Sequence, residues 1–450
     1  MQCHHYDAGR CRSCALMGVP YGVQLTDKDA AVRARLDAAV PAEAWLPPQA
    51  SAESGFRNKA KLVATGTAAA PRLGILDPEQ HPRHHDGTGH DLRDCGLYED
   101  GMEAAFHAIA ETITAAGLEP YDVAARTGEL KSVIVTLSPN RELMVRFVLR
   151  SAARLDALRA AVPGLRSALA GLGTPAAVVT ANLHPEHVAL PEGPDEVHLA
   201  GDPTLRMELN GIGLRLRPQG FFQTNTDVTR RLYATAAAWL AEAAAADGTP
   251  VHSAWDLYCG VGGFAFHLAR PVAEGGAGVA EVWGLETSED AVAAARDTAA
   301  ELGLAGAVRF TAGDATRALS PGRREPSEAL SSGKREPSET LSSGKREASD
   351  ALSSGRREPS DAGAHPDDDA APAAMPDAVV VNPPRRGIGP ELAARLQDSG
   401  VPHVLYSSCN AASLAKDLAA MPAYRARRAQ VFDMFPQTGH AETLVLLSRA

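Results

Sequence analysis

The chain has 450 residues, of which 45% are apolar and 22% charged, and its formal net charge at pH 7 is −11. It is too long for a single hydrophobic core, so we expect two or three domains. No apolar run reaches the roughly 18 residues of a membrane span, and the N-terminus lacks the apolar core of a signal peptide. We therefore expect a cytoplasmic protein. The negative charge argues against indiscriminate nucleic-acid binding, although it leaves room for a local basic groove.

The first fourteen residues contain three cysteines. Cys3, Cys11 and Cys14 follow a C-x7-C-x2-C spacing, and Cys95 lies far downstream. Disulfides are rare in the cytoplasm, so a metal site is favoured over a disulfide framework or unrelated free thiols. Four thiolates can hold a tetrahedral zinc ion or a [4Fe–4S] cluster, and spacing alone does not decide between them. Either group would tie the N-terminus to the first domain.

A short basic segment, FRNKAK, precedes a strand-like run. Its cations Arg57, Lys59 and Lys61 alternate along the chain, so their side chains share one face if the segment is extended. Three cations on one face suit a phosphate backbone. A solvated edge strand, where lysine discourages strand pairing, explains the pattern equally well.

Residues 101–225 mix helical and strand-like patterns. The expected elements are a helix at Met102–Ala116 and strands at Ser132–Leu137, Leu143–Leu149, Ala177–Leu183 and Gly213–Leu216. The loop Arg217–Asn225 is rich in amides and aromatics that could stack on a base or hydrogen-bond a ligand. We expect Asp227 to cap the following helix, Val228–Ala245.

A glycine loop between a strand and a helix predicts a nucleotide-type site at residues 254–264. The glycines that would let the backbone approach a ligand closely are Gly260, Gly262 and Gly263. Glu286 ends the next strand, where an acid suits a ribose diol. The G-x-G-G pattern departs from the dinucleotide fingerprint and favours S-adenosylmethionine. We interpret Cys259, inside the loop, as a packing residue.

An eleven-residue unit repeats between Gly322 and Asp361. Its glycines and prolines exclude a stable coiled coil. The segment is charged and free of aromatics, so we expect a disordered insertion over residues 320–376. It interrupts the sheet domain at a loop, where added length costs little stability.

Polar residues follow two of the strands expected after the insertion. Asn382 ends the strand Asp377–Val381, and Arg385 and Arg386 add positive charge beside it. Cys409 lies at the carboxyl end of a buried strand, which is where ligands bind in open α/β sheets. It is therefore placed to attack a ligand, with a buried structural thiol as the alternative.

Glu442 precedes the last expected strand, Thr443–Ser448. A lone glutamate is ordinarily a solvated surface residue. This glutamate stands at the edge of a strand.

As a set, these motifs resemble the bacterial RNA uracil-C5 methyltransferases. The resemblance covers nearly the whole chain and rests on YDAGRCRSC, FRNKAK, RPQGFFQTN, DLYCGVGGF, NPPRRGIG, YSSCN and FDMFPQTGHAE. It implies an α/β fold with three parts. These are an N-terminal iron–sulfur segment (1–100), a mixed α+β central RNA-binding domain (101–225) and a Rossmann-like S-adenosylmethionine-dependent methyltransferase domain (226–450). The repeat insertion is a departure from the family.

The resemblance also implies an activity, transfer of a methyl group to carbon 5 of a uracil in 23S rRNA, with uracil 747 as the implied position. It makes Cys409 the nucleophile and Glu442 the base. The residues implied to hold the [4Fe–4S] cluster are Cys3, Cys11, Cys14 and Cys95. Those implied to bind S-adenosylmethionine are Gln223, Tyr258, Glu286 and Asn382.

We expect a monomer without a protein partner. Three alternatives remain: methylation of another rRNA or tRNA uracil, an amino-methyltransferase that shares the NPP motif, and a catalytically silent RNA-binding protein.

Overall fold

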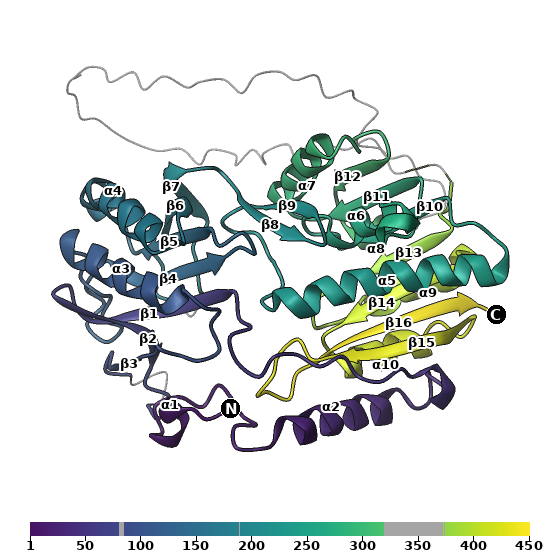
Figure 1. Cartoon of the computed structure of the whole chain (residues 1–450), viewed down its shortest axis with the longest axis horizontal. Helices are drawn as coiled ribbons and strands as arrows, with labels where there is room; N and C mark the ends of the chain where they lie inside the picture. The colour runs from purple at the N-terminus through teal and green to yellow at the C-terminus, as the bar shows by residue number, and fades with distance from the viewer. Residues whose placement is uncertain (81–84, 189, 319–371, 373) are drawn as a thin grey trace, which may run out of the picture.

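The computed structural model describes residues 1–80, 85–188, 190–318, 372 and 374–450 (Figure 1). Most of the expected insertion, residues 320–371 and 373, therefore lies outside the described residues. The described strands form two seven-stranded sheets and one two-stranded sheet. No helix in the described part of the chain is long and apolar enough to cross a membrane.

The first seven-stranded sheet has the order β3-β2-β1-β4-β5-β6-β7. Its strands are β1 (Lys59–Thr67), β2 (Ala70–Leu76), β3 (Gly89–Asp91), β4 (Leu130–Leu137), β5 (Leu143–Leu149), β6 (Ala176–Leu183) and β7 (Asp195–Gly201). Neighbours are antiparallel except for β5 and β6. Helices α3 (Met102–Ala115) and α4 (Leu155–Gly171) contact each other and share one core with the sheet. The sheet contains strands from both sides of residue 100, so the predicted boundary falls inside it.

The second seven-stranded sheet has the order β12-β11-β10-β13-β14-β16-β15. Its strands are β10 (Ser253–Leu257), β11 (Glu281–Glu286), β12 (Val308–Ala312), β13 (Ala378–Val381), β14 (His403–Ser408), β15 (Tyr424–Phe432) and β16 (Glu442–Arg449). The first five are parallel, and β16 is antiparallel to both of its neighbours. The strand order reverses at β10, which places a ligand crevice at the carboxyl edge there.

Helices cover both faces of this second sheet. One core packs β-strand side chains against α5 (Thr226–Asp247), α6 (Gly263–Ala269) and α7 (Glu289–Glu301). The other core includes α2 (Tyr21–Leu36), α8 (Ala315–Ala318), α9 (Gly389–Ser399) and α10 (Ala411–Ala419). This three-layer arrangement agrees with the predicted Rossmann-like fold. A hairpin of β8 (Leu205–Leu209) and β9 (Ile212–Leu216) contacts α7.

The N-terminal segment crosses from one sheet to the other. The short helix α1 (His4–Asp7) lies near the first sheet, whereas α2 lies beside α10 of the second (Figure 1). After a 3₁₀ turn at Ala42–Ala44, the chain runs along β15 through bridges at Trp45 and Gln49 and then enters β1. Residues 21–49 thus contribute to the surroundings of the second sheet.

The predicted elements agree with those observed to within a few residues, but one predicted cap is wrong. Asn225, rather than Asp227, caps α5, because its side chain accepts a hydrogen bond from the N–H of Val228. Asp227 already belongs to the helix, where it forms an ion pair with Arg231 one turn away. The helix therefore begins two residues earlier than its apolar pattern indicates.

Candidate active site and cysteine cavity

Three of the four predicted cofactor residues meet at the carboxyl edge of the second sheet. Leu257 of β10 is paired with Leu285 of β11 and Val381 of β13. The next residue on each strand is therefore Tyr258, Glu286 or Asn382, at one level of the sheet. Parallel strands present such positions side by side, next to the point where the strand order reverses.

The glycine loop is fastened to this edge. The N–H of Gly260 donates to Oε2 of Glu286 at 3.2 Å, and Oε1 of Glu286 accepts from the N–H of Ser288 at 3.0 Å. Asp256 is fully buried and accepts from the N–H of Ala265 at 3.0 Å, which fixes the start of α6. Burial raises the pKa of Asp256 to about 7. Glu286 is thus positioned from both sides.

The glycines of the loop have different roles. Gly262 has φ +87°, and a Cβ there would lie 2.7 Å from the Phe266 ring and 2.8 Å from the Phe310 ring. Gly260 has φ +54°, and a Cβ there would enter open space. Gly262 is needed for packing, whereas Gly260 leaves the backbone accessible to a ligand.

Tyr258 and Gln223 complete the predicted set in different ways. Burial raises the pKa of Tyr258; the nearby carboxylates of Asp314 and Glu286 raise it further, and Arg386 opposes them. Gln223 is buried in the loop before α5, and its backbone carbonyl accepts a hydrogen bond from the side-chain amide of Asn58 at 3.1 Å. Among the described residues, no hydrogen bond connects Gln223 with Tyr258, Glu286 or Asn382. Cys259 is buried in the core, in agreement with a packing role.

Cys409 and Glu442 lie next to each other across two strands. Ser408 of β14 is paired with Thr443 of the antiparallel strand β16, so Cys409 and Glu442 are the next residues on either side. Glu442 is only 2% exposed, which excludes the solvated surface residue considered above. Ser407, also buried, donates to Oε1 of Glu442 at 2.5 Å. Burial raises the pKa of Glu442 to about 7, with the Ser407 hydrogen bond opposing.

The Cys409 thiol is half-buried and has a cation beside it. Burial raises its pKa, the Glu442 carboxylate raises it further, and the Arg385 guanidinium lowers it. The side chain of Asn410 donates to the carbonyl of Arg385 at 2.8 Å and accepts from the N–H of Ala412 at 3.1 Å. Asn410 thereby caps α10 and holds the Arg385 loop against the cysteine.

A cavity of about 350 Å³ opens beside Cys409. Its other walls are residues 410–412, residues 439–441 and four residues of α2, namely Lys28, Ala31, Val32 and Arg35. Neither α2 nor Ser407 was predicted from the sequence to belong to this site. The cysteine position was predictable from its strand, whereas nothing in residues 21–36 indicates which distant loop the helix contacts.

A second cavity, of about 240 Å³, is lined by the four predicted cluster ligands together with Arg57, Lys59 and Lys61. The four ligands are Cys3, Cys11, Cys14 and Cys95. Burial raises the pKa of Cys14 to about 12; the other three cysteines raise it further, and Arg57 lowers it. Burial lowers the pKa of Lys59 to about 8, with Lys61 contributing. The alternating cations do share a face, and that face is directed toward the cysteines.

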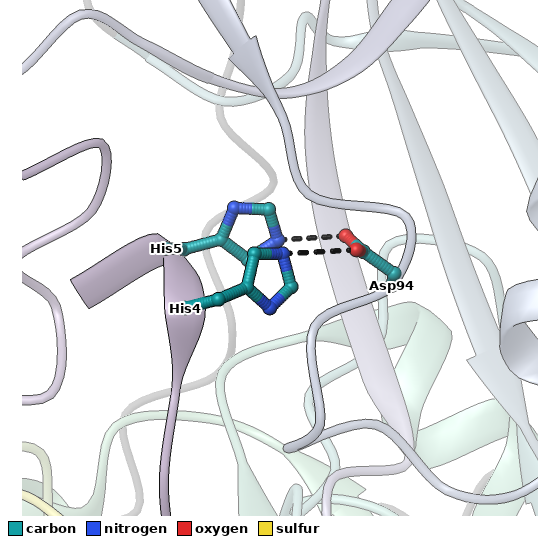
Figure 2. A group of neighbouring side chains, drawn as sticks. All are labelled: His4, His5 and Asp94. Atoms are coloured by element: carbon teal, nitrogen blue, oxygen red, sulfur yellow. Dashed lines mark hydrogen bonds and ion pairs between the residues drawn. The ribbon is translucent and has the colours of Figure 1, made fainter. Parts of the chain in front are cut away.

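A histidine–aspartate contact joins the two cysteine-bearing segments (Figure 2). Nε2 of His5 lies 2.6 Å from Oδ1 of Asp94, and Nε2 of His4 lies 3.1 Å from Oδ2. These residues are adjacent to Cys3 and Cys95, so the contact brings the distant cysteines together. Neither histidine was identified from the sequence, although both directly follow Cys3.

Buried hydrogen bonds connect the N-terminal segment to the loop before Glu442. Gln24 and Gln437 exchange two of them: Nε2 of Gln24 donates to Oε1 of Gln437 at 2.9 Å, and the N–H of Gln437 donates to Oε1 of Gln24 at 3.1 Å. Nζ of Lys28 donates to Oδ1 of Asp433 at 2.7 Å, with both side chains almost fully buried. This loop therefore depends on α2 for its position.

Known proteins resemble the chain over its full length. The 23S rRNA (uracil(747)-C(5))-methyltransferase RlmC of Citrobacter koseri is 39% identical over 450 residues, and that of Cronobacter sakazakii is 40% identical over 450 residues; the matches cover 100% of each chain. The family profile described as tRNA (uracil-5-)-methyltransferase matches residues 374–450.

A solved structure has the same fold. The crystal structure of Pyrococcus abyssi tRNA (uracil-54, C5)-methyltransferase in complex with S-adenosyl-L-homocysteine superposes with a TM-score of 0.67 and 19% identity. The match covers 97% of this chain and 84% of that one.

Proposed function

The chain belongs to the RNA (uracil-C5)-methyltransferase family, and we propose that it transfers a methyl group from S-adenosylmethionine to carbon 5 of a uridine in 23S rRNA. The relatives named for uracil 747 favour that position. The observation that carries the proposal is the placement of Cys409 beside the buried Glu442, on the same sheet edge as Tyr258, Glu286 and Asn382.

Cys409 acts as the nucleophile in this proposal. Carbon 5 of uracil is a poor nucleophile, so the thiolate first adds to carbon 6 and forms an S–C6 bond, while the electron pair moves to an enolate across C4 and C5. When bound, S-adenosylmethionine supplies the methyl group that carbon 5 takes up, as the bond from that methyl group to sulfur breaks and S-adenosylhomocysteine leaves. The Arg385 guanidinium supports the thiolate, because it lowers the pKa that burial raises.

Glu442 acts as the base that completes the reaction. Its carboxylate takes the proton from carbon 5, the C5–C6 double bond re-forms, and the S–C6 bond breaks to release Cys409. A buried carboxyl whose pKa is raised to about 7 is suited to accept a proton near neutral pH. The uracil has to leave the RNA stack to reach both groups.

The cysteine cavity fits a [4Fe–4S] cluster held by Cys3, Cys11, Cys14 and Cys95. Zinc binds sulfur at about 2.3 Å, which places tetrahedral thiolates about 3.8 Å apart. Among the described residues, the group with ligand atoms within 4.8 Å of one another is His4, His5 and Asp94, so no three cysteine sulfurs are that close. The wider spacing supports a cluster. When bound, the cluster supplies a cross-link, and no step of the reaction passes through it.

Iron and sulfide analysis of anaerobically purified protein tests the cluster. We expect about four irons in the wild type, substantial loss in Cys95→Ser, and no loss in Cys259→Ser, a buried cysteine outside the cavity. Zinc in place of iron would contradict the assignment.

The remaining parts of the proposal concern RNA and organisation. The boundary at residue 225 stays a prediction, as do the monomeric state and the cytoplasmic location, whereas the first sheet spans the boundary predicted at residue 100. The first sheet and the loop Arg217–Asn225 would hold the RNA, and Phe221 of that loop is 71% exposed, which suits stacking on a base.

A methyl-transfer assay tests the activity. Labelled S-adenosylmethionine and unmodified 23S rRNA should give label at carbon 5 of one uridine with the wild type and none with Cys409→Ala. Glu442→Gln should accumulate a covalent adduct with the RNA, because the S–C6 bond cannot break without proton removal. Label that persists in Cys409→Ala would contradict the nucleophile assignment, and label in tRNA instead would change the substrate. A protein that binds RNA without transferring label would favour the silent binder.

A further inference from the structure

Helix α2 contributes one complete face to the Cys409 cavity. Its lining residues Lys28, Ala31, Val32 and Arg35 have the i, i+3, i+4, i+7 spacing of a single helical face. The helix comes from the N-terminal segment, about 375 residues before Cys409, and contacts α10, which begins just after that cysteine. The cavity beside Cys409 is therefore incomplete without α2.

The cavity offers an uncompensated cation within an acidic protein. Its lining includes Arg35, the Asp433-paired Lys28 and His440, and no carboxylate, although the chain has a net charge of −11. Burial lowers the pKa of His440, and the cations Arg385 and Lys28 lower it further. A cavity with this charge attracts an anion such as a phosphodiester.

The two cations of α2 differ in their surroundings. Lys28 is 5% exposed and is held by Asp433 and by the carbonyl of Phe435 at 3.0 Å. Arg35 is exposed at the cavity and makes no hydrogen bond or ion pair with another described residue. Lys28 fixes the helix in place, whereas Arg35 remains available to a ligand.

We propose that α2 is the second wall of the nucleotide pocket and that Arg35 binds a phosphate of the RNA strand beside the methylated uridine. The inference rests on the proposed function and adds a contact to it. Guanidinium groups bind phosphate oxygens in pairs, so one arginine can hold a phosphate of the strand beside the pocket. A phosphate contact affects RNA affinity and leaves the chemical step unchanged.

The experiment compares Arg35→Gln with the wild type in two measurements. Binding of an unmodified 23S rRNA fragment is followed at several salt concentrations with S-adenosylhomocysteine present. The affinity should weaken about 10-fold, and the slope of log affinity against log salt concentration should fall by the amount expected for about one phosphate contact. The single-turnover rate at saturating RNA and the affinity for S-adenosylmethionine should stay unchanged.

Two variants serve as controls. Arg35→Lys keeps the charge and should recover part of the affinity. Arg309→Gln makes the same charge change at an exposed position on β12, the far edge of the sheet, and should behave as the wild type.

The outcomes separate this inference from the proposed function. A methylating wild type with unchanged affinity and salt dependence in Arg35→Gln would overturn the phosphate contact and leave the activity in place. An equal loss in Arg309→Gln, or a loss of saturated rate in Arg35→Gln, would also overturn it. A wild type that methylates no uridine would overturn the activity and the inference with it.

Discussion

The hydrogen bond from Ser407 to Glu442 should set the pH range in which the enzyme works. The two oxygens are 2.5 Å apart in a buried environment, and the pKa of Glu442 is raised to about 7 by burial although this bond opposes the shift. A hydrogen bond to a charged group contributes about 1.5–3 kcal/mol. Since about 1.4 kcal/mol corresponds to one pKa unit, Ser407→Ala should raise the pKa of Glu442 by at least about one unit.

The direction of the effect follows from the role of the base. Glu442 has to be a carboxylate to accept the carbon-5 proton, so activity is present above its pKa and falls as the pH decreases through it. With a pKa near 8 in place of about 7, the ionised fraction at pH 7.5 falls from about three quarters to about one quarter. The rate should therefore fall about threefold at pH 7.5 and about tenfold at pH 6, and recover near pH 9.

Single-turnover methyl transfer across this pH range, at saturating RNA and S-adenosylmethionine, measures the shift. Ser408→Ala is the matched control, because the Ser408 hydroxyl bonds to the backbone of Asn410 and not to Glu442. It should leave the midpoint of the pH profile in place. A Ser407→Ala profile that is lowered equally at every pH, with its midpoint unmoved, would refute the reasoning and assign Ser407 an orienting role alone.

Further substitutions at three places in the fold probe stability. Lys28→Met leaves the buried Asp433 without its cation and should lower the free energy of unfolding, measured by chemical denaturation, by about 3–5 kcal/mol. A loss below about 1 kcal/mol would show that the ion pair does not hold α2. Asn225→Ala removes the cap of α5 and should cost about 1–2 kcal/mol, whereas Asp227→Ala should stay within about 0.5 kcal/mol, and the reverse order would restore Asp227 as the cap. Gly262→Ala combines left-handed backbone strain with contact against two aromatic rings and should lower the free energy of unfolding by more than about 2 kcal/mol. Gly260→Ala should lower it by about 1 kcal/mol and should also weaken S-adenosylmethionine binding. Equal shifts of the unfolding temperature in the two variants would contradict this distinction.

Local patterns in the sequence determined much of the second sheet and the positions of its polar residues. Buried apolar runs indicated the strands that precede Asn382 and Cys409, and glycines indicated the loop after β10. The α/β methyltransferase fold and the family, expected from the motifs, agree with the solved structure and the full-length relatives. These predictions succeed because strand ends and tight turns depend on residues close together in the chain.

The contacts that complete the site were decided by the tertiary structure. Gln24 bonds to Gln437 across 413 positions, and α2 reaches Cys409 only because the N-terminal segment returns along β15. The burial of Glu442 and its bond from Ser407 depend on the antiparallel register of β14 and β16. Asn225, the cap of α5, also donates to Ser51, a residue 174 positions away. Composition and periodicity describe one segment at a time, whereas register and packing between segments follow from the burial of the whole chain.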